Sequence, residues 1–70
     1  MIKELVGKRI KQLRKNKGLS QETLGYECEL DRTYIASVEN GRRNISIINL
    51  EKIANALNVS LSVFFDFDKE

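Results

Sequence analysis

The chain has 70 residues and a formal net charge of +2; 41% of its residues are hydrophobic and 31% are charged. A chain of this length forms one domain, and a single copy with so small a core is only marginally stable. It contains no histidine and one cysteine, which excludes an internal disulfide, the usual general base at neutral pH and a transition-metal site. We therefore expect a cytoplasmic protein that is not an enzyme and has no catalytic residue, cofactor or metal. We also expect no membrane association, since no apolar run approaches the roughly 18–20 residues of a membrane span.

The small net charge is the sum of opposed blocks. Residues 1–19 carry seven lysines or arginines and one glutamate, whereas residues 20–31 carry four acidic residues and no basic one. Residues 32–43 carry three arginines and one glutamate, and residues 44–70 carry two lysines and four acidic residues. The local charge therefore says more about binding partners than the total does.

Apolar residues recur at helical spacing along nearly the whole chain, which predicts an all-α fold. A first helix of about fifteen residues follows from an i, i+3, i+4 pattern at Ile2, Leu5, Val6, Ile10 and Leu13. Gly18 stands where a residue just past a helix end belongs. Ser20 is the expected N-cap of a short second helix that directs Leu24 and Cys28 inward.

The second half of the chain predicts three further helices. Asp31 is the N-cap candidate of a helix from Arg32 to Asn40, closed by Gly41. Ser46 caps a fourth helix, whose core stripe is Leu50, Ile53, Ala54 and Leu57. Ser60 caps a short fifth helix over 61–65, and an acidic tail over 66–70 follows. The expected architecture is a compact domain of five short helices.

The second and third helices have the spacing of a helix-turn-helix, over about residues 20–40. The third helix keeps an exposed face of small or hydrogen-bonding side chains: Arg32, Thr33, Ala36, Ser37 and Asn40. The major groove of DNA admits a helix with such a face. The sequence therefore predicts a module that binds double-stranded DNA.

Three stretches carry a resemblance to a known family: IKQLRKNKGLSQETLG at 10–25, LDRTYIASVENGRRNIS at 30–46 and LEKIANALNVSLSVFF at 50–65. They resemble the XRE/Cro-type helix-turn-helix domains of phage repressors and of restriction–modification controller proteins. DRTYI followed by VENGRRNIS is most similar to the controller proteins. The resemblance covers nearly the whole chain. It implies a lambda-repressor-like fold for residues 1–70 and a homodimeric, sequence-specific transcriptional regulator that binds pseudo-palindromic operators.

The resemblance also implies roles for individual residues. The base-reading positions are Arg32, Thr33 and Ser37, and a bidentate contact of Arg32 with a guanine is worth about 1–3 kcal/mol of discrimination. The implied phosphate-binding positions are Gln21, Asn40, Arg43 and Asn44. Arg14 and Glu39 match a partly buried ion pair that links the first and third helices.

Two further phosphate contacts are expected from position in the sequence. Lys17 is the lysine of the basic first helix that lies nearest to the motif. Tyr34 has two open interpretations: it packs over the first helix, or its hydroxyl reaches a phosphate.

Two residues depart from the family pattern, which has Ala at 25 and Gly at 29. Gly25 is expected to cost up to about 1 kcal/mol of helix stability, and Glu29 is expected in a left-handed conformation.

The C-terminal third carries more apolar side chains than one small core needs. Ile47, Ile48, Phe64, Phe65 and Phe67 either complete the core or form a two-fold dimer interface within about residues 46–67. We favour the dimer, which places two recognition helices about one DNA turn, roughly 34 Å, apart.

Other partners and functions stay open. Glu22, Glu27 and Glu29 are the acidic residues best placed to touch RNA polymerase, a candidate further partner in a nucleoid-associated regulator. The alternative functions are a phage or plasmid repressor and, in a different class, an antitoxin-like protein-interaction module.

Overall fold

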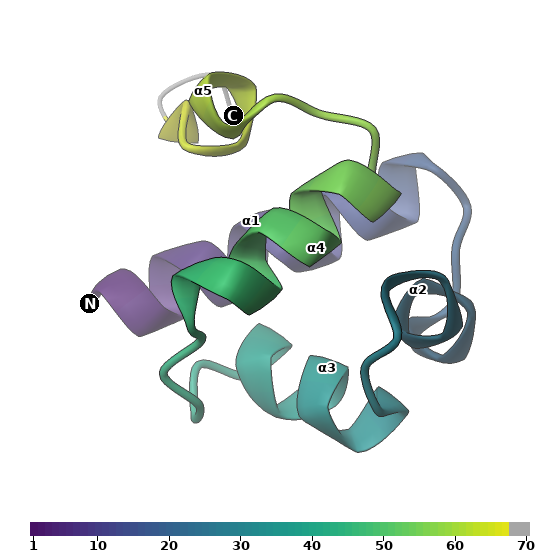
Figure 1. Ribbon diagram of the computed structural model, residues 1–70. Coiled ribbons are helices and arrows are strands. Elements are labelled where there is room, and N and C mark those ends of the chain that lie inside the picture. The colour runs from purple at the N-terminus through teal and green to yellow at the C-terminus, as the bar shows by residue number, and fades with distance from the viewer. Residues whose placement is uncertain (68–70) are drawn as a thin grey trace.

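The computed structural model describes residues 1–67 (Figure 1). Its helices are α1 (Ile2–Asn16), α2 (Gln21–Cys28), α3 (Arg32–Glu39), α4 (Ile47–Ala56) and α5 (Leu61–Phe64). No strand occurs within this range, so the all-α, five-helix prediction is confirmed. The expected acidic tail lies outside the described residues from Asp68 onward. None of the helices over residues 1–67 is both long enough and apolar enough to cross a membrane.

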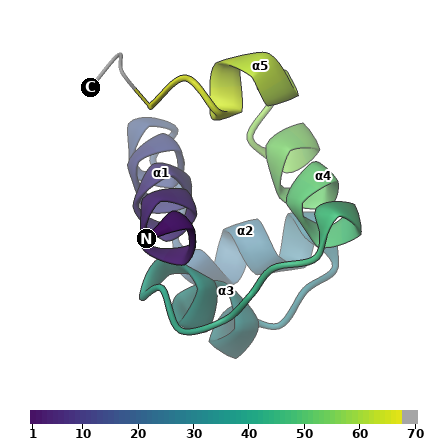
Figure 2. The same cartoon turned by 90° about the vertical axis from the view of Figure 1, so that its left-hand side faces the viewer.

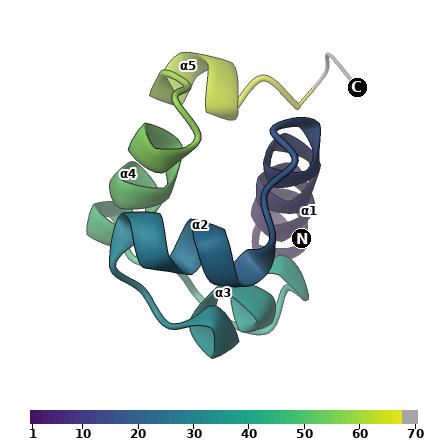
Figure 3. The same ribbon diagram turned by 90° about the vertical axis from the view of Figure 1, so that its right-hand side faces the viewer.

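The helices enclose one core. α3 packs against α1 and α2, α2 packs against α4, and α4 packs against α5. Figures 2 and 3 show α1 and α4 on opposite sides, joined by α2 and α3 at one end, with α5 at the other end. The core side chains are Val6, Ile10, Leu24, Cys28, Ile35, Val38, Leu50, Ile53, Ala54, Leu57 and Phe64. Among residues 1–67 the other helices pack on one side of α3, and Arg32, Thr33 and Asn40 are exposed.

Local capping explains where the helices begin and end. The three serines expected as N-caps accept hydrogen bonds from backbone N–H groups: Ser20 from Thr23 at 3.0 Å, Ser46 from Asn49 at 3.1 Å and Ser60 from Val63 at 3.2 Å. Asp31 is the N-cap residue of α3, but its side chain makes no capping bond. Gly18 and Gly41 have φ values of +72° and +74°, so each ends its helix in a conformation that disfavours other residues.

The apolar stripe of α1 is buried only from Val6 onward. Ile2 and Leu5, which continue the pattern, are 59% and 42% exposed. Ile2 borders a groove at the edge of the core that Phe65 also lines. The apolar spacing therefore predicts more burial in the first turn of α1 than the structure has.

Gly7 of α1 lies against α3, and a Cβ there would come within 2.2 Å of the Val38 carbonyl oxygen. Glycine at this position therefore lets α1 approach α3 closely.

A buried arginine fastens α5 to α1. The Arg9 guanidinium donates to the carbonyl oxygens of Phe64 at 2.8 Å and Val63 at 2.7 Å, and to Gln12 Oε1 at 2.8 Å. These carbonyls lie at the C-terminal end of a one-turn helix, where intrahelical donors are missing. The sequence indicates a basic first helix but does not predict that Arg9 binds α5.

The three C-terminal phenylalanines have different environments. Phe64 is fully buried in its own protomer, so its assignment to a dimer interface was wrong: it fills the space that α5 covers. Phe65 is 42% exposed and stands edge-on to Phe64 and to the half-buried Phe67, with ring centroids 5.2 Å and 5.9 Å away. Only part of the aromatic cluster is therefore available to a partner.

Candidate nucleic-acid interface

The turn between α2 and α3 has a strained geometry that glycine at position 25 permits. Glu29 ends α2 with φ 61° and ψ 39°, in the left-handed conformation that was expected. The Leu30 N–H donates to the Gly25 carbonyl at 2.8 Å. A Cβ on Gly25 would lie 2.5 Å from the Leu30 carbonyl oxygen. Gly25 therefore does more than remove a methyl group from α2. The backbone at Leu30 passes so close to Gly25 that no side chain would fit there.

An ion pair links the last turn of α1 to the end of α3, and a further hydrogen bond ties in the start of α2. Arg14 Nε lies 2.7 Å from Glu39 Oε2, and Arg14 Nη2 donates to Glu39 Oε1 at 3.0 Å. The remaining Arg14 contact is to the Leu19 carbonyl at 2.8 Å. Donation of these hydrogen bonds to the Glu39 carboxylate raises the pKa of the Arg14 guanidinium. Gln21 Nε2 also donates to Glu39 Oε1, at 3.1 Å, so one carboxylate orients both the buried Arg14 and Gln21, an expected phosphate-binding residue.

The outer face of α3 carries the expected base-reading residues. Arg32 and Thr33 are exposed and Ser37 is half-buried. Thr33 and Ser37 are four residues apart, which places them on one helix face. Within residues 1–67, neither Arg32 nor Thr33 has a side-chain hydrogen bond or ion pair. These side chains can therefore meet a ligand without first breaking contacts of their own.

The loop after α3 places cationic and polar groups next to that face. The Arg42 N–H donates to the Ser37 carbonyl at 3.0 Å, which folds the loop back on α3. Arg43 lies with its guanidinium carbon 5.0 Å from the centre of the Tyr34 ring, within cation–π range. The side chains of Asn40, Arg42, Arg43 and Asn44 are all exposed.

Tyr34 is held by the loop and α4. Its hydroxyl accepts a hydrogen bond from Asn49 Nδ2 at 3.1 Å, and its ring packs against the core. Neither interpretation of Tyr34 foresaw this contact with α4, and its contact with a phosphate stays a prediction. On its other side Tyr34 borders an open, acidic groove lined also by Glu27, Glu29 and Asp31.

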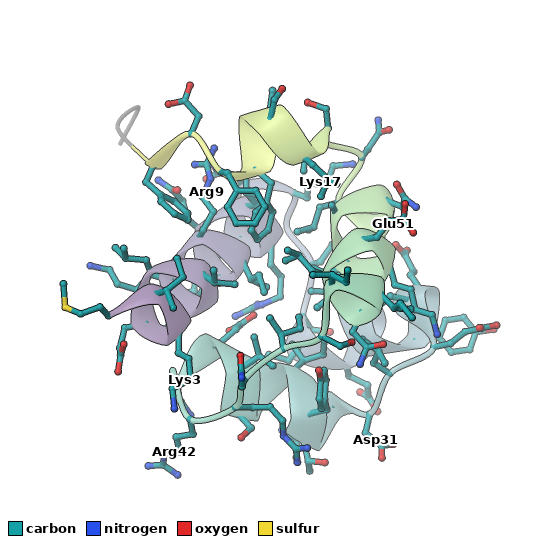
Figure 4. All side chains as sticks on the ribbon, turned by 60° about the vertical axis from the view of Figure 1, so that its left-hand side comes forward. Lys3, Arg9, Lys17, Asp31, Arg42 and Glu51 are labelled. Atoms are coloured by element: carbon teal, nitrogen blue, oxygen red, sulfur yellow. The ribbon has the colours of Figure 1, made fainter. Side chains whose placement is uncertain are left out.

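Two lysines are placed differently from the expectation. In Figure 4 Lys17 lies at the level of the connection between α4 and α5, at the opposite end of the molecule from Asp31 and Arg42. Proximity in sequence was misleading here, because α1 ends on the side away from α3. Lys3 was not singled out, yet it lines a groove with Arg43 and Asn44. It is a better candidate for a phosphate contact than Lys17.

Sequence reasoning missed Asn49 and Lys3. Asn49 lies in the first turn of α4, three residues after Ser46. This spacing predicts only that its backbone N–H caps the helix, not that its side chain contacts Tyr34. In the sequence Lys3 looks like the other lysines of α1. Only the fold, which places the first turn of α1 beside the loop after α3, distinguishes it.

Comparisons with known proteins agree with this geometry. The family model described as helix-turn-helix matches residues 10–64. Control protein C.MunI of Mycoplasma sp is 51% identical over 71 aligned residues, which span 99% of this chain and 96% of that protein. Control protein C.BamHI of Bacillus amyloliquefaciens is 46% identical over 94% of this chain and 83% of its own length.

Solved structures give the same result. The restriction–modification controller protein C.AhdI of Aeromonas hydrophila superposes with a TM-score of 0.87 at 44% identity, over 90% of this chain and 91% of its own. C.Esp1396I, as a tetramer in complex with its natural 35 base-pair operator, superposes with a TM-score of 0.91 at 43% identity, over 99% of this chain and 92% of its own. The chain therefore belongs to the helix-turn-helix family, among the control proteins of restriction–modification systems.

Proposed function

We propose that this chain is a sequence-specific transcriptional regulator that binds operator DNA as a homodimer and controls a restriction–modification system. The observation that carries the proposal is the exposed face of α3 beside the Arg43 loop, where Arg32 and Thr33 make no side-chain hydrogen bond or ion pair within residues 1–67. C.Esp1396I has been solved bound to operator DNA, which supports the same activity here. A regulator of this kind acts by occupying DNA and needs no catalytic residue.

The residues proposed to read DNA coincide with positions studied in that relative. Variants of C.Esp1396I have been solved in which an arginine, the threonine after it and the tyrosine after that are each replaced. This chain has the same three residues in the same order at Arg32, Thr33 and Tyr34. We assign base reading to Arg32, Thr33 and Ser37. We assign phosphate binding to Gln21, Tyr34, Asn40, Arg43 and Asn44, with Lys3 in place of Lys17.

We place the dimer interface on the exposed apolar surface of α4 and α5. Ile47 and Ile48 are 83% and 65% exposed, and Phe65 is 42% exposed. Large exposed apolar side chains are typical of association surfaces. Phe67, which packs edge-on against Phe65, belongs to the rim of the same surface.

Contact with RNA polymerase is assigned to the acidic residues of α2 and its C-cap. Glu22, Glu27 and Glu29 are exposed, and Glu27 and Glu29 line the groove beside the turn. In an in vitro transcription assay at an activated promoter, Glu22→Ala with Glu27→Ala should bind DNA normally and lose activation. Full activation by this variant would remove the assignment. A regulator with these partners works in the cytoplasm, at the nucleoid.

The experiment that tests the function is selection of duplexes from a random-sequence library by the purified protein. We expect enrichment of a pseudo-palindromic site, bound with an affinity that falls steeply with salt. Absence of saturable binding to any duplex at about 50–100 mM salt would favour a protein-interaction module instead. An adjacent gene pair for a methyltransferase and an endonuclease would separate a controller from a phage repressor such as the 42% identical immunity repressor of Bacillus phage phi105.

A further inference from the structure

We propose that Asn49 of α4 is a positioning residue for DNA binding, which turns the hydroxyl hydrogen of Tyr34 outward to a DNA phosphate. The proposal rests on the DNA-binding function proposed above and adds a residue from a helix outside the helix-turn-helix. It starts from one contact: Asn49 Nδ2 donates to the Tyr34 hydroxyl oxygen at 3.1 Å.

The direction of this hydrogen bond decides what the hydroxyl can do. A tyrosine hydroxyl has one hydrogen to donate and two lone pairs that accept. Asn49 occupies a lone pair, and within residues 1–67 the hydroxyl hydrogen has no acceptor. The hydroxyl is therefore left as a donor, and a donor that is already accepting a hydrogen bond is strengthened by it. The complementary ligand is an anionic oxygen.

The charges around the hydroxyl favour a phosphate from one side. The Arg43 guanidinium carbon, 5.0 Å from the ring centre, adds a cation over the face of the Tyr34 ring. Asp31, Glu27 and Glu29 line a groove that Tyr34 also lines, and they repel an anion there. An incoming phosphate is therefore directed toward the side of Tyr34 that faces the Arg43 loop and the first turn of α4.

Asn49 is itself fixed in place. Its backbone N–H is bonded to Ser46 Oγ at 3.1 Å as part of the α4 N-cap, and its side chain is half-buried. A side chain held at both its backbone and its amide loses little entropy when DNA binds. Preorganisation of Tyr34 by Asn49 is thus the role that the geometry supports.

The test is a double-mutant cycle on binding to two duplexes, the library-selected duplex and a mixed-sequence duplex of the same length. Tyr34→Phe keeps the ring under Arg43 and should weaken binding roughly tenfold, the lower range for a hydrogen bond to a charged acceptor. Asn49→Ala should weaken binding by about threefold, and the double variant should bind no more weakly than Tyr34→Phe alone. Both duplexes should lose affinity equally, because a phosphate carries no sequence information.

Salt dependence separates this role from a general structural one. Neither Tyr34→Phe nor Asn49→Ala removes a charge, so the log–log salt slope should not change, whereas Arg43→Ala should lower it by about one. Asn55→Ala, an exposed asparagine of the same helix, is the matched control and should bind normally. Asn49→Ser is a second variant in case Asn49→Ala unfolds, and circular dichroism verifies that each variant is folded.

Additive losses in the double variant, or a normal affinity for Asn49→Ala, would overturn the assignment of Asn49 while leaving DNA binding intact. Failure of the unmodified protein to bind either duplex would overturn the proposed function and this inference together.

Discussion

Arg14 and Glu39 form a two-pronged ion pair between α1 and α3, at 2.7 Å and 3.0 Å, with side chains only 9% and 2% exposed. Glu39 also holds Gln21 at the start of α2. The pair thus connects three of the helices that define the proposed DNA-binding face.

Glu39→Ala removes one partner and leaves the Arg14 charge buried. Such a loss costs about 3–5 kcal/mol, comparable to the total stability of a small domain at roughly 0.05–0.15 kcal/mol per residue. We expect the variant to be largely unfolded at 25 °C in urea titrations followed by circular dichroism. Glu51→Ala, an exposed glutamate of α4, should change stability by less than about 0.5 kcal/mol. A Glu39→Ala variant as stable as this control would contradict the role of the pair.

Glu29 adopts a left-handed conformation that glycine tolerates better, with φ 61°. Glu29→Gly should therefore stabilise the fold, by up to about 1 kcal/mol. Asn58 has φ 59°, but asparagine accepts this region more readily, so Asn58→Gly should give a smaller gain. Gly25→Ala should destabilise, since its Cβ would lie 2.5 Å from the Leu30 carbonyl oxygen. Thermal unfolding measures all three, and a loss of stability in Glu29→Gly would show that the glutamate side chain has a stabilising role of its own.

The helices and their caps could be predicted because their signals are local. Ser20, Ser46 and Ser60 each act through a backbone N–H three residues away, a distance that the sequence itself fixes. The exposed positions Arg32 and Thr33 follow from the period of a single helix once Asp31 is recognised as its N-cap.

Contacts between distant segments could not be predicted in this way. The sequence does not reveal that Asn49 meets Tyr34 or that Arg9 binds carbonyls of α5, because both depend on how helices cross. Lys17 was misplaced for the same reason: proximity to the motif along the chain does not imply proximity to α3 in space. Phe64 was assigned to the surface because composition counts apolar side chains without saying which of them the last helix buries.

The exposed apolar surface of α4 gives a prediction about assembly. Ile48→Asp together with Ile47→Asp should convert a dimer to a monomer in sedimentation velocity, since charges are depleted at the core of such interfaces. Tyr26, 85% exposed on α2, is a matched control outside the proposed interface, and Tyr26→Asp should remain a dimer. The monomeric variant should bind the operator at least tenfold more weakly, because both half-sites are then bound independently. An unchanged dimer would place the interface elsewhere.

Cys28 should be protected in the native protein. Burial raises the pKa of its thiol from 9.0, and the thiol is hydrogen-bonded to the Leu24 carbonyl. At pH 8 a thiol reagent should therefore label the native chain at least about 100-fold more slowly than the urea-unfolded chain. Because the unfolded thiol ionises first, the stability contributed by the neutral thiol is complete below pH 9 and declines as pH rises through the higher native pKa. Native labelling at nearly the unfolded rate would show that Cys28 is accessible.

The most direct test of the account is duplex selection from a random library by the unmodified protein and by Arg32→Ala in parallel. The unmodified protein should enrich two related half-sites about one DNA turn apart, roughly 34 Å. Arg32→Ala should lose preference at one base pair in each half-site and keep the rest. If Arg32→Ala enriches the same site with the same preference at every position, α3 does not read DNA through Arg32, and the central claim is wrong.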